Sequence, residues 1–195
     1  MYKKTNGLCG IDEAGRGPLA GPLVVAGVVF KKNIIDDNKV LDGLNDSKKL
    51  TEKKRENLYN DICKNSFYHI VTTSNRVIDE IGLSKALKNS IVEIMEKIEA
   101  KTYLMDGNTS FGIELLKHKI KADATVMEVS AASILAKVTR DRFMCEIAPT
   151  YPQYDFQKHK GYGTKAHVES MRKFGLCDLH RVSFKVKSLE EPTLF

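Results

Sequence analysis

The sequence predicts an α/β fold, a sheet flanked by helices, with a small helical and irregular C-terminal appendage. Short apolar runs rich in β-branched residues, such as residues 23–30, are typical of strands. They alternate with longer segments, such as residues 84–100, in which apolar side chains recur at the spacing of an amphipathic helix. Beyond Pro149, prolines and glycines interrupt the chain, which predicts the irregular appendage.

The individual elements follow from these patterns. Thr51 is the expected N-cap of the first helix, because a threonine hydroxyl can accept a hydrogen bond from the first helical turn. Polar residues 31–43 are expected to form a loop, and a turn rich in glycine and proline should join the first two strands. Strands are expected at residues 8–11, 23–30, 67–73, 103–105 and 118–121, and helices at residues 51–63, 84–100, 130–147 and 165–174.

Composition narrows the class of protein. A formal net charge of +6 over 195 residues is, by itself, a weak indication of a nucleic-acid partner. The four cysteines are scattered, which indicates reduced thiols, and Cys177 with His180 lacks a second pair at zinc-ligand spacing. Without an apolar run of membrane-spanning length or a signal peptide, a soluble cytoplasmic protein is expected. We expect one domain over residues 1–187, with the part from about residue 150 contributing to a cleft, and a flexible tail over residues 188–195.

An acidic pair followed by a glycine turn is the most informative stretch. Asp12 and Glu13 come directly after the first apolar run, and adjacent carboxylates repel each other unless a cation or a proton lies between them. The turn built on Gly15, Arg16 and Gly17 can present backbone N–H groups and a guanidinium to an anion. A metal-binding pair next to a phosphate-binding turn is the arrangement that phosphodiester chemistry requires.

The same turn also matches a dinucleotide-binding fingerprint, G-x-G-x-x-A, from Gly15 to Ala20, with Asp36 and Asp37 at the expected distance. That fingerprint needs a helix directly after the glycines. Here Gly21 and Pro22 intervene and a second strand follows, which argues against this interpretation.

Two further acids follow the same strand-end pattern. Asp106 and Asp123 each end or closely follow a short apolar stretch, and such positions converge at one edge of an α/β sheet. Oxygen ligands alone favour Mg²⁺ or Mn²⁺ over zinc. Glu13 raises a geometric question, because adjacent residues of a strand point to opposite faces, so it can join Asp12 only if the strand ends or twists there.

Residues 10–22, G-I-D-E-A-G-R-G-P-L-A-G-P, match the opening signature of the type 2 ribonucleases H (ribonuclease HII) without a break, and the chain resembles that family. Other matched blocks are D-S-K-K-L at residues 46–50, A-A-S-I-L-A-K-V-T-R-D at 131–141, H-K-G-Y-G-T at 159–164 and H-R-V-S-F at 180–184. Ala122 departs from the glycine of many bacterial members.

The resemblance implies an RNase H-like mixed sheet and an endonuclease that cuts the RNA strand of RNA/DNA hybrids and single ribonucleotides in duplex DNA. It implies that Asp12, Glu13, Asp106 and Asp123 hold two Mg²⁺ or Mn²⁺ ions. Hydrolysis of the phosphodiester at these ions is expected to leave 5′-phosphate and 3′-hydroxyl ends. A monomer is expected. The substrate contacts expected from the matched blocks are Gly15, Arg16, Gly17, Lys48, Ser133, Lys137, Tyr162 and Arg181. For His159 and His167, a role as proton shuttle and a structural role on the surface or in the core are both open, and the structural role is the commoner one for a single histidine.

The C-terminal Leu194 and Phe195 follow a polar linker and resemble short peptides that dock into sliding clamps, although a frayed or self-packed terminus is the favoured explanation. Two other functions share some of these features. A non-catalytic nucleic-acid-binding module would have no need of four gathered acids. A resolvase of the RNase H-like type would have the acids without the G-R-G and G-Y-G elements.

Overall fold

The computed structural model describes residues 3–4, 7–31, 44 and 50–186. The predictions for Lys48, Leu194, Phe195 and the loop at residues 32–43 lie outside this range. No helix in the described part of the chain is long and apolar enough to cross a membrane.

The main sheet has five strands in the order β4–β3–β2–β6–β7. These are β2 (Leu8–Ala14), β3 (Leu23–Phe30), β4 (Ser66–Thr73), β6 (Thr102–Asp106) and β7 (Leu116–Lys119). The sheet is mixed, because β2–β3–β4 pair antiparallel whereas β2–β6–β7 pair parallel. A separate parallel pair joins β1 (Lys3–Lys4) to β5 (Ile98–Glu99).

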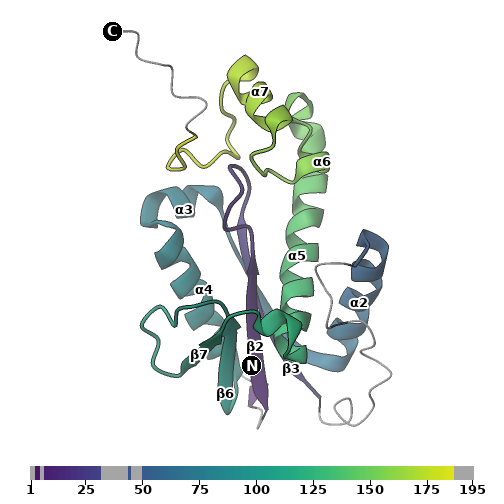
Figure 1. The fold of residues 1–195 in the computed structure, drawn as a ribbon, viewed down its shortest axis with the longest axis vertical. Helices are drawn as coiled ribbons and strands as arrows, with labels where there is room; N and C mark the ends of the chain where they lie inside the picture. The colour runs from purple at the N-terminus through teal and green to yellow at the C-terminus, as the bar shows by residue number, and fades with distance from the viewer. Residues whose placement is uncertain (1–2, 5–6, 32–43, 45–49, 187–195) are drawn as a thin grey trace.

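Helices cover both faces of the sheet, with α3 and α4 on one side and α2 and α5 on the other (Figure 1). The long helices are α2 (Glu52–Asn65), α4 (Leu83–Lys97) and α5 (Met127–Ile147), and shorter ones are α3 (Asn75–Ile81), α6 (Phe156–His159) and α7 (Lys165–Phe174). Single 3₁₀ turns lie at Ala122–Ala124, Ala148–Thr150 and Pro152–Tyr154.

Strand β3 is apolar throughout because both of its faces are buried. Val25 and Val29 pack in the cluster that contains Ile91 of α4. Val24 and Val28 pack in the cluster that contains Leu135 of α5. Alternate side chains of one strand therefore build two cores, which fixes the register of the sheet between the two helical layers.

Close packing places β2 directly against the start of α5. A Cβ added at Gly10 would lie 2.3 Å from the backbone of Glu128. Ala131, Ala132 and Ala136 of α5 are fully buried in the same layer. The acidic end of β2 is thus held next to α5, which carries Ser133 and Lys137.

The C-terminal part packs around the far end of α5. Phe156, Tyr154 and Met171 form a third cluster with Met144 of α5 and Ala20 of the turn after β2. This appendage confirms the predicted irregular C-terminal region and lies over the turn between β2 and β3 (Figure 1).

The predicted elements are confirmed with shifted ends, but the short helices α3 and α6 and the two-residue strands β1 and β5 were not predicted. Strand β2 continues to Ala14 instead of ending at Ile11, and β7 ends at Lys119, two residues before the predicted end. Helix α3 was not predicted because seven residues show too little periodicity. Its boundaries are nevertheless visible in the sequence: the Ser74 hydroxyl accepts from the Val77 amide, and Gly82 ends the helix at a φ of +82°.

Candidate active site

Two carboxylates reach the site on neighbouring parallel strands. Ile11 of β2 pairs with Met105 of β6, so Asp12 and Asp106, one residue further along, lie side by side at the same sheet edge. Asp12 is only 7% exposed and Asp106 is half-buried. The strand-end reasoning thus located both side chains correctly.

Glu13 joins them although the strand does not end there. It pairs with Val25 of β3, and β2 runs on to Ala14. Even so, Asp12 and Glu13 both line one cavity, and the Asp12 carboxylate accepts the Glu13 amide at 2.8 Å. Of the two conditions expected for Glu13 to join the site, the first, a strand that ends at this point, is therefore not needed.

The cavity has a volume of about 420 Å³ and is lined by both acidic and cationic side chains. Its lining combines the acids, the glycine turn, α5 and one residue each from α2 and the C-terminal part: Asp12, Glu13, Ala14, Gly15, Arg16, Gly17, Arg55, Asp106, Ser133, Ile134, Lys137 and Tyr162. Sequence reasoning missed Arg55, since α2 is rich in charged residues and Arg55 looked like part of its solvated face.

Burial and like charge act together on the acids. The pKa of Asp12 is raised well above its ordinary value, chiefly by burial and then by the neighbouring Glu13 charge, while a hydrogen bond with Ser133 opposes this shift. Burial also raises the pKa of Glu13, against the influence of Arg16, which lies 3.3 Å from its Oε1. The Oε2 atom of Glu13 is buried and has no hydrogen-bond donor among the residues that the structure describes. Such a concentration of oxygen ligands suits a hard divalent cation.

Asp123 lies behind this group. It is 3% exposed, on the 3₁₀ turn Ala122–Ala124, and it does not line the cavity. Asp106 accepts a hydrogen bond of 2.8 Å from the amide of Ala122, the residue before Asp123. Among the described residues, no group of three or more His, Cys, Asp or Glu side chains is arranged so that it could hold a metal ion as it stands.

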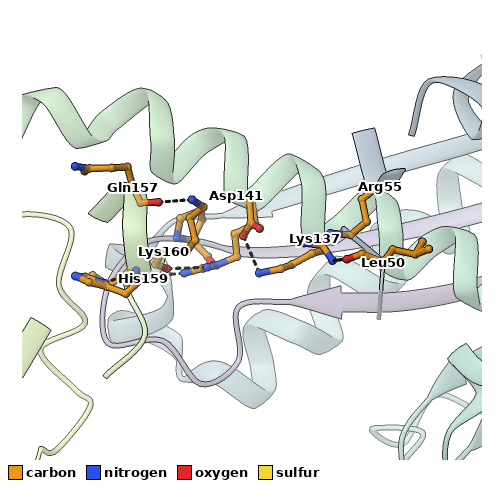
Figure 2. Close-up of polar contacts among 11 residues, drawn as sticks. Leu50, Arg55, Lys137, Asp141, Gln157, His159 and Lys160 are labelled. Carbon is orange, nitrogen blue, oxygen red and sulfur yellow. Dashed lines mark hydrogen bonds and ion pairs between the residues drawn. The ribbon is translucent and has the colours of Figure 1, made fainter. Parts of the chain in front are cut away.

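The cavity lining also contains cationic and aromatic side chains. Tyr162 is 41% exposed, and the Nζ of Lys137 lies 5.7 Å from its ring centroid. Lys137 also pairs with Asp141 one helical turn along α5, at 2.9 Å (Figure 2). Tyr162 therefore presents its ring to the cavity, as its place between two glycines predicts.

Arg181 has a different position from the one expected for a phosphate contact. Its side chain is 2% exposed, and it donates hydrogen bonds to the carbonyls of Gly21 and Arg16. Arg140 is likewise buried and donates to the carbonyls of Ala20, Pro22 and Lys160. Both guanidinium groups hold the backbone of the glycine turn, and neither lines the cavity.

Neither histidine considered as a proton shuttle lines the cavity. His167 is completely buried, and burial lowers its pKa to about 4. His159 is half-buried, and its Nε2 hydrogen-bonds to the Tyr154 carbonyl at 2.7 Å. The geometry therefore gives both rings a structural position behind Tyr162.

Comparison with known proteins agrees with this geometry. The family model described as ribonuclease HII matches residues 9–187. The chain belongs to the ribonuclease HII family. Ribonuclease HII of Aliarcobacter butzleri (strain RM4018) is 60% identical over 186 residues, which cover 94% of this chain and 93% of the relative. Ribonuclease HII of Sulfurovum sp. (strain NBC37-1) is 56% identical over 195 residues, with 100% of both chains covered.

Solved structures agree on the fold. Ribonuclease HII from the PCNA:RNase HII complex of Archaeoglobus fulgidus aligns with a TM-score of 0.81 and 28% identity, covering 96% of this chain and 98% of that chain. The ribonuclease H2 of Pyrococcus horikoshii OT3 aligns with a TM-score of 0.77 and 28% identity, covering 91% and 93%. A ribonuclease HIII solved in complex with Mn²⁺ shares the fold at 19% identity and a TM-score of 0.70, covering 93% of this chain and 68% of that one.

As a ribonuclease HII, the chain is a hydrolase, an endonuclease that acts on the RNA strand of RNA/DNA hybrids. Membership also accounts for the mixed sheet, which the family's solved structures share.

Proposed function

We propose that this ribonuclease HII cuts the RNA strand of hybrids and also duplex DNA at single embedded ribonucleotides, for ribonucleotide removal. The observation that supports this most is one cavity whose lining contains the buried Asp12, the half-buried Glu13 and Asp106, the glycine turn and Tyr162. The carboxylates can bind the metal ions that act on the reacting phosphate. The glycine turn and the aromatic ring can contact the sugar and its 2′-hydroxyl.

Asp12, Glu13 and Asp106, together with Asp123 next to the Ala122 amide that bonds Asp106, would be the residues that hold two Mg²⁺ or Mn²⁺ ions. When bound, such ions supply an activated water and neutralise the charge that develops on the leaving 3′-oxygen, so that 5′-phosphate and 3′-hydroxyl ends result. The buried Oε2 of Glu13, which has no donor of its own, favours this assignment.

The protein's own groups would bind and orient the strand. Arg16 and Lys137 line the cavity and can contact phosphates, and Ser133 hydrogen-bonds Asp12 and thus orients its carboxylate. Gly15, Gly17 and Tyr162 line the same cavity and would be the residues that distinguish a 2′-hydroxyl from hydrogen. Arg181 contributes through the turn, by holding the carbonyl of Arg16. Lys48 remains a proposed phosphate contact from the sequence alone.

The test is cleavage of a DNA duplex that carries one ribonucleotide, with Mg²⁺. The wild-type protein should cut at the ribonucleotide, and Asp106→Asn should lower kcat by a factor on the order of 10³ or more, because a lost carboxylate ligand weakens the metal site. Binding of the uncut duplex by Asp106→Asn should persist. Normal turnover in Asp106→Asn would refute the site, and an uncut ribonucleotide duplex with the wild-type protein would refute the substrate assignment.

A sliding clamp is the proposed protein partner. The structural neighbour from Archaeoglobus fulgidus was solved as a PCNA:RNase HII complex, and Leu194 and Phe195 follow a polar linker here. Deleting these two residues should abolish binding to the bacterial clamp in a pull-down while hybrid cleavage stays unchanged. Equal clamp binding by the full-length and shortened proteins, or none by either, would contradict this role.

A further inference from the structure

Three histidine rings lie behind Tyr162, outside the cavity. The rings of His159 and His167 stack with centroids 4.4 Å apart, and the rings of His167 and His180 follow at 5.2 Å. His167 and His180 are 0% and 2% exposed. Rings so fully enclosed have few orientations available, so their hydrogen bonds define where the neighbouring backbone lies.

The hydrogen bonds assign one proton position to each ring. The Nδ1 of His167 lies 2.9 Å from the carbonyl of Tyr162, and a carbonyl only accepts, so this nitrogen carries the proton. In the neutral ring, Nε2 of His167 is then an acceptor, and its partner at 3.1 Å, Nε2 of His180, must donate. The remaining Nδ1 of His180 accepts from the amide of Cys177 at 2.9 Å, which agrees with this assignment.

The result is a directed chain of hydrogen bonds from Cys177 through His180 and His167 to the carbonyl of Tyr162. Burial lowers the pKa of both His167 and His180, which keeps both rings neutral at neutral pH and preserves the chain. His159 adds a parallel contact, since its Nδ1 accepts from the amide of Gly161 at 3.2 Å. The backbone on both sides of the exposed Tyr162 ring is therefore bonded to an imidazole, the half-buried His159 at Gly161 and the buried His167 at Tyr162.

The surrounding backbone is held as firmly. Gly161 has a φ of +81°, and a Cβ there would lie 2.4 Å from the Ala20 carbonyl. The amide of Leu19 donates to the Gly161 carbonyl at 2.8 Å, and Arg140 donates to the Lys160 carbonyl at 2.9 Å. The side chain that projects from this loop into the cavity is thus placed by contacts from outside the cavity.

We propose that His167 is a specificity-positioning residue, which sets the place of the Tyr162 ring by donating from Nδ1 to the Tyr162 carbonyl, with His180 holding the required tautomer. The proposal rests on the proposed function, in which Tyr162 senses the embedded ribonucleotide. His167 touches no reacting atom, and it acts only through Tyr162.

Selectivity is the first test. The measured quantity is the ratio of kcat/KM for a DNA duplex with one ribonucleotide to kcat/KM for an all-RNA/DNA hybrid. Tyr162→Ala should lower this ratio about tenfold or more, and His167→Leu, which keeps apolar bulk without a donor, should lower it in the same direction. His167→Asn, whose amide can replace the Nδ1 donor, should recover most of the ratio.

A double-mutant cycle separates positioning from general damage. In the Tyr162→Ala background, His167→Leu should produce no further change in the ratio, because the residue through which His167 acts is gone. Equal, additive losses in both backgrounds would overturn the proposal, as would a ratio that His167→Leu leaves unchanged.

A readout independent of cleavage uses the absence of tryptophan from the sequence. Tyr162→Trp introduces a single indole, whose fluorescence anisotropy reports how firmly the ring is held. Adding His167→Leu should lower the anisotropy, and His167→Asn should largely retain it. Because His167→Leu can unfold the protein, His180→Phe is the second variant and should lower the anisotropy to a smaller extent. It keeps the bond from His167 to the Tyr162 carbonyl and removes the donor to His167 together with the acceptor for the Cys177 amide.

The outcomes are distinguishable after circular dichroism confirms folding. Unchanged anisotropy in folded His167→Leu and His180→Phe variants overturns the positioning role. A wild-type protein that does not cut the ribonucleotide duplex overturns the proposed function, whereas the anisotropy result still decides whether His167 positions residue 162.

Discussion

At the scale of single residues, three features of the surroundings of Asp12 each make its charged form unfavourable. It is 7% exposed, its neighbour Glu13 carries the same charge, and Asp106 adds a smaller repulsion. Only part of this is offset by its hydrogen bonds with the Glu13 amide and Ser133. Repulsion of this kind in the protein is relieved by protonation or by a bound cation, which links stability to pH and to metal.

Asp12→Asn should therefore stabilise the metal-free protein at neutral pH by on the order of 1 kcal/mol. The unfolded Asp12 loses its proton near pH 3.8, whereas the folded one retains it to a higher pH. Folding thus takes up a proton between these two values, and the contribution of Asp12 to stability is lost as pH rises through the folded pKa.

Thermal melts from pH 4 to 8 check this expectation. The wild-type protein should lose stability relative to Asp12→Asn as pH rises, and Mg²⁺ should stabilise the wild-type protein more than the variant. Parallel pH profiles for the two proteins would contradict it.

Gly17 and Gly15 make a matched pair for the glycine turn. A Cβ at Gly17 would meet no protein atom within 4 Å, so Gly17→Ala should change the free energy of unfolding by less than about 0.5 kcal/mol. It should nevertheless raise KM for the ribonucleotide duplex several-fold, because the methyl group occupies space that the sugar needs.

Gly15→Ala is the contrasting variant. Gly15 has a φ of +100°, and its Cβ would lie 2.5 Å from both Arg140 Nε and the Pro22 carbonyl, so the protein should be destabilised by about 2 kcal/mol or more. Chemical denaturation and steady-state kinetics on both variants separate folding from substrate approach. An unchanged KM in Gly17→Ala would argue against close contact there.

At the scale of elements, the short helix α3 anchors the segment that supports the glycine turn. The Asp79 carboxylate accepts the amides of Val182 and Ser183, each at 3.0 Å. Asn75, at the start of the same helix, donates to the carbonyls of Asp178 and His180. Arg181 lies between these anchored residues and holds the carbonyls of Gly21 and Arg16, so α3 acts on the site through the C-terminal segment.

Asp79→Ala should destabilise the protein by about 1–2 kcal/mol, since two backbone donors and the Ser183 hydroxyl lose their acceptor. It should also raise KM, because Arg181 then holds the turn less firmly. Urea denaturation and hybrid-cleavage kinetics measure the two effects.

Arg76→Ala is the control on the same helix. Arg76 and Asp178 form an exposed pair at 3.8 Å, which contributes little, so this variant should change stability by less than about 0.5 kcal/mol and leave KM unchanged. A KM in Asp79→Ala equal to that of Arg76→Ala would refute the link from α3 to the turn.

At the scale of the whole molecule, a protein with net charge +6 carries its buried acids at one edge of the central sheet. The sheet with its two helical layers holds Asp12 and Asp106, and the C-terminal part adds Tyr162 from the far end of α5. The cavity therefore joins parts of the chain that only the complete fold brings together, and its lining contains Arg16, Arg55 and Lys137 as well as the acids.

Binding of an RNA/DNA hybrid should weaken steeply with salt, because cationic side chains that contact phosphates displace bound counterions. Lys137→Met should reduce the slope of log Kd against log salt by about one. Lys97→Met is the matched control, since Lys97 does not line the cavity. It ends α4 shortly before the start of β6, whereas the site residue Asp106 is at the other end of that strand. Fluorescence anisotropy titrations in Ca²⁺ measure both slopes, and equal slopes in the two variants would exclude Lys137 as a phosphate contact.

Periodicity predicted most elements of this fold, because β3 and α5 bury whole faces and their apolar residues leave a regular pattern. The end of β2 was misplaced, because Asp12 and Glu13 are polar and still pair within the sheet. Helix α3 was missed, because only Asn75 and Ile78 of its seven residues are buried. Arg55 and the structural positions of Arg181 and His167 could not be predicted, since charge and residue type do not indicate which way a side chain points.

The local order of residues by itself determined the strands and long helices, the acidic pair beside its glycine turn and membership of the ribonuclease HII family. Only the tertiary structure decided that Glu13 shares the cavity with Asp12, that Asp123 lies behind Asp106, and that buried arginine and histidine side chains hold the loops around Tyr162. The physical reason is that hydrophobic periodicity and turn chemistry act between residues close in the chain. Burial, hydrogen-bond partners and pKa shifts depend on residues that lie far apart in sequence and meet only in the folded protein.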